Sequence, residues 1–172
     1  YKDFGITNYR CVLSLRDPEN KEKYHDDDEM WNTAEDALRD VMNSIGIEYT
    51  EEIGEAAFYG PKLDIQIKNV HGKEDTLITI QIDFQLAERF GMTYVDAEGQ
   101  TKYPYVIHRT SIGCYERTLA LLLEKYAGAL PTWLMPEQVR VLPISDRLID
   151  DAKKVEEQLS RAGIRVSCDT RS

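Results

Sequence analysis

The residues best suited to chemistry lie in one short stretch, 107-IHRTSIGCYER-117. Arg117 stands at the head of an apolar segment, 119-LALLLEKY-126, where the positive end of a helix dipole and apolar surroundings both disfavour a cation without a partner. A negative group should therefore lie beside this arginine. The candidates are a carboxylate, such as Glu116 or Asp83, and a phosphate, which the planar guanidinium group is well shaped to bind.

Polar side chains also recur along the segments that must position this stretch. Two runs, 62-KLDIQIKNV-70 and 76-TLITIQIDF-84, alternate apolar and polar residues and are joined by a connection short enough for an antiparallel hairpin. Successive side chains of a strand point to opposite faces, so Lys62 and Gln81 belong to the polar face. That face is either exposed to water or forms the base of a binding cleft. His108 lies at the end of a later run. One imidazole does not make a zinc site, so His108 is either a structural residue or one ligand of a metal site that other residues complete.

Further elements complete the expected fold. Apolar residues at helical spacing predict an amphipathic helix over 30–45 that covers a sheet, and residues 9–16 and 103–109 are typical of strands. The helix expected over 111–126 is apolar nearly all round, as in helices that are buried against a sheet. This order of elements is of the α+β type, an antiparallel sheet flanked by helices.

The last part of the chain differs in pattern and charge. Residues 128–138 contain glycine and two prolines and indicate a linker, and a strand, a helix and a strand of parallel, α/β type follow over 139–168. Residues 1–137 hold 14 Lys and Arg against 25 Asp and Glu, whereas 138–172 hold 7 against 6. We therefore expect two domains, 1–134 and 135–172. The second is expected to be cut short, because one strand–helix–strand unit leaves sheet edges open.

The composition excludes several classes of protein. A net charge of −10 over 172 residues does not suggest a surface that attracts phosphate backbones. The three cysteines are odd in number and lack a CxxC pattern, which argues against a disulfide framework and favours a reducing, cytoplasmic setting. No apolar run approaches the roughly 20 residues of a membrane span, so no membrane association is expected. The first residue is not Met, and we expect the chain to be a piece of a longer protein.

At this point the residues resemble a known family. The segment 107-IHRTSIGCYERTLALLLE-124 resembles the third signature motif of class II aminoacyl-tRNA synthetases. Four further segments are similar to the threonyl-tRNA synthetases within that class: 58-FYGPKLDIQIK-68, 79-TIQIDFQL-86, 105-YVIHR-109 and 127-AGALPTWLMPEQV-139. The resemblance covers essentially the whole chain. It implies part of the catalytic core over 1–134 and the start of an anticodon-binding domain from 135.

The resemblance also implies roles for individual residues. Arg117 would be catalytic and hold the terminal phosphate of a bent ATP, and Lys62 would be the second catalytic residue. His108 would be one of three zinc ligands, the other two lying upstream of Tyr1. Substrate binding is implied for Tyr59, Gln81, Thr110, Gly113 and Cys114. Cys114 departs from the family pattern, which favours serine there, and any hydroxyl hydrogen bond at this position is put in doubt.

The implied activity is that of the longer parent protein. Threonine would be activated with ATP and Mg²⁺ to threonyl-adenylate and transferred to tRNA(Thr), with zinc recognising the amino and hydroxyl groups of threonine. The parent would be a cytoplasmic homodimer, and the 172-residue piece by itself is expected to be inactive. Two alternatives stay open: another synthetase of the same subclass, such as the prolyl enzyme, and a synthetase-like paralogue without catalysis that binds tRNA or regulates.

Overall fold

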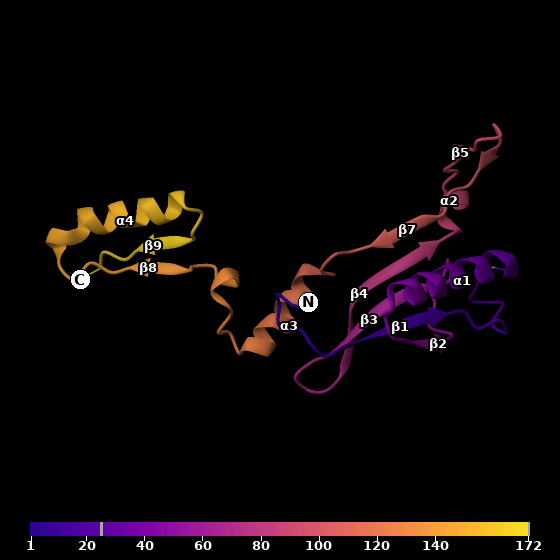
Figure 1. Ribbon diagram of the computed structural model, residues 1–172, viewed down its shortest axis with the longest axis horizontal. Coiled ribbons are helices and arrows are strands. Elements are labelled where there is room, and N and C mark those ends of the chain that lie inside the picture. Colours follow the sequence, from indigo (N-terminus) through magenta and orange to yellow (C-terminus); the bar gives the residue numbers. More distant parts are fainter. Residues whose placement is uncertain (25, 172) are drawn as a thin grey trace. The chain divides into compact units, whose positions relative to one another are not determined.

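The alternating segments form a five-stranded sheet whose strands lie in the order β2-β1-β3-β4-β7 (Figure 1). The computed structural model describes residues 1–24 and 26–171 and divides into two units, Tyr1–Lys125 and a second that begins at Tyr126. Each unit is described by itself. The strands of the sheet are β1 (Tyr9–Leu15), β2 (Tyr49–Ile53), β3 (Lys62–Lys68), β4 (Glu74–Asp83) and β7 (Val106–Arg109). All neighbouring pairs are antiparallel except β1 and β2, which are parallel.

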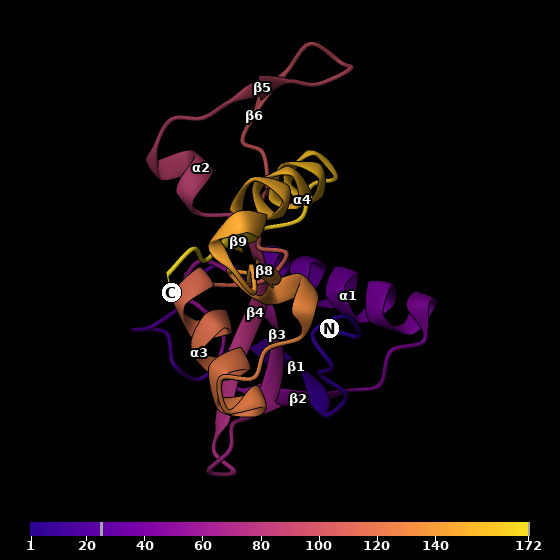
Figure 2. The ribbon, with the colours of Figure 1, turned by 90° about the vertical axis from the view of Figure 1, so that its left-hand side faces the viewer.

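Helix α1 (Asp28–Ile45) covers the apolar face of this sheet (Figures 1 and 2). The helix begins where the Asp27 carboxylate accepts a hydrogen bond from the backbone N–H of Met30, 2.9 Å away, and it ends at Gly46 in the left-handed conformation. On the face toward the sheet, Met42 packs against Cys11 and Leu63. Leu38 packs in the same way against Leu13 and Leu15 of β1. The predicted helix and the predicted α+β architecture are confirmed.

The polar face of the sheet is ordered by the register of the strands. Lys62 of β3 pairs with Gln81 of β4, and Gln81 pairs with His108 of β7. Ser14 of β1 pairs with Lys62 on the other side. Cross-strand partners share a face, so these four residues form one row across four strands. The hairpin expected between 62–70 and 76–84 is therefore confirmed, with a register shift at Ile65/Gln66.

Short elements that the sequence patterns did not predict connect β4 to β7. They are the helix α2 (Leu86–Arg89) and the two-stranded hairpin of β5 (Tyr94–Val95) and β6 (Thr101–Lys102). The expected strand over 103–109 is shorter, because pairing with β4 begins at Val106. Strand β2 was also not predicted, since its sequence, YTEEI, carries too few apolar residues for a buried strand.

Helix α3 (Tyr115–Tyr126) is more exposed than its composition predicts. Only Thr118 and Leu122 are buried, whereas Leu119 and Leu123 remain 52% and 45% exposed. Leu121 packs on a cluster at the start of β4 that includes Leu77 and Ile78. The helix expected over 111–126 thus begins at Tyr115 and packs against the sheet through one face, while its other apolar positions meet no further layer among the described residues.

The second unit contains one parallel pair of strands and one long helix. Strand β8 (Val139–Val141) pairs with β9 (Val166–Cys168), and α4 (Ile149–Arg161) connects them after the short 3₁₀ helix η2 (Asp146–Leu148). A second 3₁₀ helix, η1 (Thr132–Leu134), lies in the Pro-containing segment before β8. The predicted strand, helix, strand unit of parallel type is confirmed.

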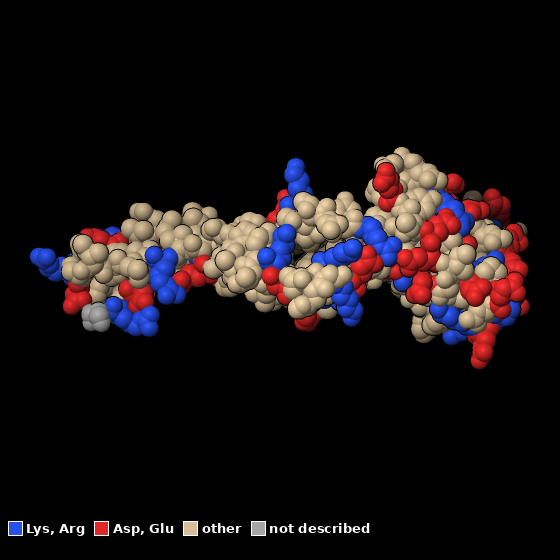
Figure 3. Space-filling view, turned by 90° about the horizontal axis from the view of Figure 1, so that it is seen from below, with Lys and Arg blue, Asp and Glu red and all other residues tan. Residues whose placement is uncertain are grey.

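Acidic residues dominate the surface around α1 in the view of Figure 3. Asp28, Glu29, Asp36 and Asp40 of this helix are all exposed.

Among the described residues no helix is both long and apolar enough to cross a membrane.

Candidate active site

The predicted site residues lie mainly along β4, at two places. Tyr59, Lys62, Gln81 and His108 come together toward its C-terminal end, and Gly113 and Arg117 lie against its N-terminal half. Two contacts with the β4 backbone fix these places. An added Cβ on Gly60 would meet the carbonyl oxygen of Ile82 at 1.8 Å, and one on Gly113 would meet that of Leu77 at 2.1 Å. Both glycines therefore allow a close approach of backbones that a larger residue would prevent.

Tyr59 joins Gln81 and His108 into one cluster. Its hydroxyl donates a hydrogen bond of 3.0 Å to Oε1 of Gln81, and its ring stacks on the imidazole of His108 with ring centroids 5.9 Å apart. The backbone of the same segment is tied to β4 and to the residue after it, since the N–H of Ile82 donates to the carbonyl of Pro61 and the N–H of Phe84 to that of Tyr59. The amide of Gln81 and the imidazole are thereby held side by side on the polar face.

His108 is oriented by a buried carboxylate. Oδ2 of Asp83 lies 3.1 Å from Nε2 of His108, within ion-pair distance but without the alignment of a full hydrogen bond. Oδ1 of Asp83 accepts the backbone N–H groups of Gln85 and Leu86 at 3.0 and 2.9 Å. Asp83 is fully buried, whereas the His108 side chain is 39% exposed. Asp83 thus faces the Nε2 edge of the imidazole from the buried side, while the histidine itself is partly exposed.

Lys62 is held by a second buried carboxylate. Its ammonium group contacts Oδ2 of Asp64, and Asp64 also accepts hydrogen bonds from Ser14 at 3.0 Å and Thr79 at 2.7 Å. Asp64 is 2% exposed. Asp64 was not among the residues that the sequence indicated for the site. The alternation of β3 placed it on the polar face with Lys62, but its partners come from β1 and β4 and follow only from the strand register.

Arg117 has neither of the carboxylate partners that the sequence suggested. Its Nη1 donates a hydrogen bond of 2.6 Å to the backbone carbonyl of Thr76. Asp83 faces His108 instead, and Glu116 accepts from the thiol of Cys114 at 2.9 Å. The structural salt bridge is therefore wrong for the described part of the chain. The physical reason is the register, which sets Asp83 near the far end of β4 from Thr76.

The loop before α3 carries the remaining predicted residues. Thr110 and Gly113 line an open hollow of about 460 Å³ together with Tyr115, and Cys114 is exposed. The contact with the Cys114 thiol lowers the pKa of the Glu116 carboxyl. Hence the thiol, which stands where the family favours serine, does find a hydrogen-bond acceptor.

A metal site is incomplete within the described residues. No three His, Cys, Asp or Glu side chains converge there in an arrangement that could hold a metal ion. His108 offers one imidazole and Asp83 a carboxylate behind it, an arrangement typical of histidines that bind metals. A four-coordinate zinc site needs two or three further ligands, so these residues do not fit a complete site.

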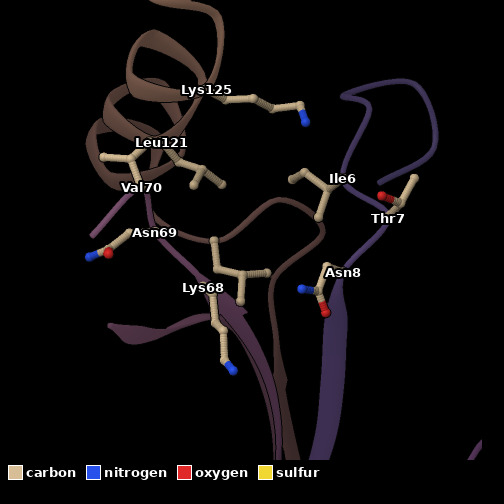
Figure 4. A pocket seen from close by; sticks show the side chains of 9 residues that line it. Ile6, Thr7, Asn8, Lys68, Asn69, Val70, Leu121 and Lys125 are labelled. Atoms are coloured by element: carbon tan, nitrogen blue, oxygen red, sulfur yellow. The ribbon is translucent and has the colours of Figure 1, made fainter. Parts of the chain in front are cut away.

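A separate cavity of about 280 Å³ lies between the segment 6–8, the end of β3 and helix α3 (Figure 4). Ile6, Ile67 and Leu121 contribute apolar walls, and Lys68 and Lys125 lie at its margin. None of the predicted site residues lines this cavity.

Comparisons with known proteins place this geometry in a family. Residues 2–126 match the model of the tRNA synthetase class II core domain (G, H, P, S and T), and residues 138–172 match that of an anticodon binding domain. A threonine--tRNA ligase from Clostridium perfringens is 62% identical over 160 residues, covering 93% of this chain and 25% of that protein. Another, from Clostridium botulinum, is 60% identical and covers 99% of this chain and 27% of the relative. The chain spans about a quarter of the length of these curated relatives.

Solved structures agree with the sequence matches. The RNA binding domain of threonyl-tRNA synthetase from Cryptosporidium parvum is 37% identical with a TM-score of 0.86, covering the whole of this chain and 42% of that one. A prolyl-tRNA synthetase from Giardia lamblia is similar in fold, with a TM-score of 0.51 at 18% identity, over 65% of this chain and 26% of its own. The chain therefore belongs to the class II aminoacyl-tRNA synthetases and, within that class, to the threonyl-tRNA synthetases.

Proposed function

We propose that the chain is part of an enzyme that activates threonine with ATP and transfers it to tRNA(Thr). The observation that carries the proposal is the cluster of Tyr59, Lys62, Gln81 and His108 on the polar face, with Arg117 farther along the same strand. Thr76, which anchors Arg117, and Gln81 lie five residues apart on β4. The strand rise makes this on the order of 15 Å. Such a span suits an amino acid and a triphosphate bound end to end.

In this proposal each residue acts by position and charge. Lys62 and Arg117 stabilise the negative charge of the carboxylate and the phosphates while the threonine carboxylate attacks the α-phosphate of ATP and pyrophosphate leaves. Gln81 and Tyr59 orient the amino acid, and Thr110, Gly113 and Cys114 form the backbone path beside the nucleotide. No side chain has to become a covalent nucleophile, because orientation and preorganised charge can supply catalysis. Mg²⁺ would enter with ATP and neutralise its phosphates.

The remaining parts of the proposal concern the longer protein. His108 would donate one zinc ligand, and the other ligands would come from outside the described residues. The boundary near 134/135 would separate the catalytic part from an anticodon-binding part that contacts tRNA. The enzyme would act as a homodimer in the cytoplasm.

The test is threonine-dependent ATP–pyrophosphate exchange by the longer protein that carries this chain. We expect His108→Ala to reduce exchange on the order of 10²-fold, because a residue that positions the amino acid is lost. His71→Ala is the matched control, since His71 lies exposed in the β3–β4 turn. The 172-residue chain alone should show no exchange. Full exchange by His108→Ala would contradict the site assignment.

The prolyl alternative is wrong, because the chain belongs to the threonyl-tRNA synthetases. The same assay tests the other alternative. A longer protein that binds tRNA(Thr) but shows no exchange with any amino acid would be the paralogue without catalysis.

A further inference from the structure

We propose that Asp64 is a positioning residue that fixes the ammonium group of Lys62 for an anionic group of the substrate. The inference rests on the proposed function, in which Lys62 faces the carboxylate and phosphate side of the site. It adds a residue that lies beneath the substrate-facing side chains and acts through one of them.

The contacts of Asp64 come from three strands. Oδ2 accepts from the hydroxyl of Ser14 on β1 and contacts the ammonium of Lys62 on β3. Oδ1 accepts from the hydroxyl of Thr79 on β4 at 2.7 Å. Each oxygen of the carboxylate is therefore hydrogen-bonded, and the carboxylate cannot turn without breaking a bond to a neighbouring strand.

Because Asp64 is buried, its carboxylate depends on a neighbouring cation for charge compensation. The Asp64 side chain is 3% exposed and the Lys62 side chain 21%. An ionised carboxylate removed from water is costly unless a cation compensates it. Among the described residues, Lys62 is the cation that contacts Asp64. The ammonium is thus held against the sheet, while the partial exposure of the side chain leaves it open to the polar face.

A purely structural role would not need this charge. Ser14 and Thr79 are neutral donors, and the amide oxygen of an asparagine could accept from at least one of them. The carboxylate is matched to the lysine, which lies in the row beside Gln81. An ammonium group that is already fixed there loses no rotamer freedom when an anion binds. This preorganisation reduces the free-energy cost of forming the reactive geometry.

The first experiment uses the 172-residue chain itself and does not depend on catalysis. The lysine side chains are labelled with ¹⁵N, and the ammonium signals are recorded by NMR. We expect the Lys62 ammonium, assigned by Lys62→Met, to exchange slowly with water and to lose that protection in Asp64→Asn. Lys125→Met identifies a lysine at the margin of a separate cavity and serves as the assignment control. A Lys62 signal that exchanges as fast as exposed lysines in the unmodified chain would overturn the proposal.

The second experiment measures the consequence in the longer protein. We expect Asp64→Asn and Lys62→Met each to lower kcat of pyrophosphate exchange on the order of 10²-fold, and the double variant to lose no more than either single one. Thr79→Val removes a neutral donor to the same carboxylate and should lower kcat less than about threefold, although it lowers the melting temperature. Additive losses in the double variant would show that Asp64 does not act through Lys62. Slow ammonium exchange in a protein that lacks threonine-dependent exchange would refute the proposed function while the Asp64–Lys62 contact stood.

Discussion

Gly113 offers a sharp test of how the loop before α3 is fixed. Its φ is +78°, and a Cβ at this position would lie 2.1 Å from the carbonyl oxygen of Leu77, where real contacts are essentially never under 3.0 Å. Gly113→Ala must therefore move the loop or β4 by roughly 0.9 Å. We expect a loss of about 1–2 kcal/mol from the left-handed backbone and about 1–3 kcal/mol from overpacking.

Gly72→Ala is the matched control. Gly72 has the same φ of +78° but nothing within 4 Å of an added Cβ, so this variant should lose only the roughly 1–2 kcal/mol of backbone strain. Urea unfolding of both variants can be followed by the fluorescence of buried Trp31, in a Trp133→Phe background that removes the signal of the second unit. Equal losses in the two variants would refute the close approach to Leu77. In the longer protein, a displacement near 1 Å should also lower pyrophosphate exchange by about 10²-fold for Gly113→Ala.

Three further predictions concern other parts of the chain. Cys114 is exposed, Cys168 is partly exposed, and Cys11 is buried with its thiol pKa raised by desolvation. In a Cys168→Ser background a thiol reagent should therefore modify Cys114 quickly and Cys11 only after unfolding, and Cys114→Ser should remove the fast phase. Burial raises the pKa of Glu35 above its ordinary value. The free energy of unfolding therefore includes a contribution from protonated Glu35 that is present at low pH and is lost as the pH rises through the folded-state pKa. Glu35→Gln should therefore gain stability relative to the unmodified chain as the pH rises above the ordinary pKa of a glutamate, about 4.3, measured by urea midpoints, and a constant difference would contradict the assignment. Arg165 donates to two backbone carbonyls within 133–135, at 2.7 and 3.0 Å, and Arg165→Ala should cost the second unit about 1 kcal/mol and speed hydrogen exchange in that segment. Unchanged exchange there would show that the two bonds do not hold the segment.

Much of the first unit follows from periodicity. The alternation of β3 and β4 was sufficient to place Lys62 and Gln81 on one face, because a strand has a period of two. Helical spacing and the stop at Gly46 were sufficient to predict α1. Short elements such as β5 and β6, two residues each, offer no periodic signal and could not be predicted in this way.

The partners of buried polar groups could not be predicted, because alternation gives the face of a residue and not its neighbours. Asp64 receives donors from Ser14 and Thr79, which lie 50 and 15 residues away in the sequence. Asp83 meets His108 only because β7 pairs with the end of β4 in the observed register. A shift of this register by one residue would place His108 on the opposite face. Register thus determines the site more than residue type does.

The guanidinium group of Arg117 contacts a backbone carbonyl where the sequence predicted an anion. The sequence predicted a negative partner for Arg117, and the structure shows the backbone carbonyl of Thr76 in contact with it. A carbonyl dipole orients a guanidinium group but carries no net charge to neutralise it. Only one of the five N–H donors of arginine is engaged in that bond. Glu116 accepts a hydrogen bond from Cys114, and Asp83 lies beside His108. Among the described residues, neither carboxylate therefore contacts Arg117. Arg117 is exposed, so water can solvate its remaining N–H donors and the structure by itself does not require an anion there. In the proposed function a phosphate, with several acceptor oxygens, would match those donors better than a single carboxylate does.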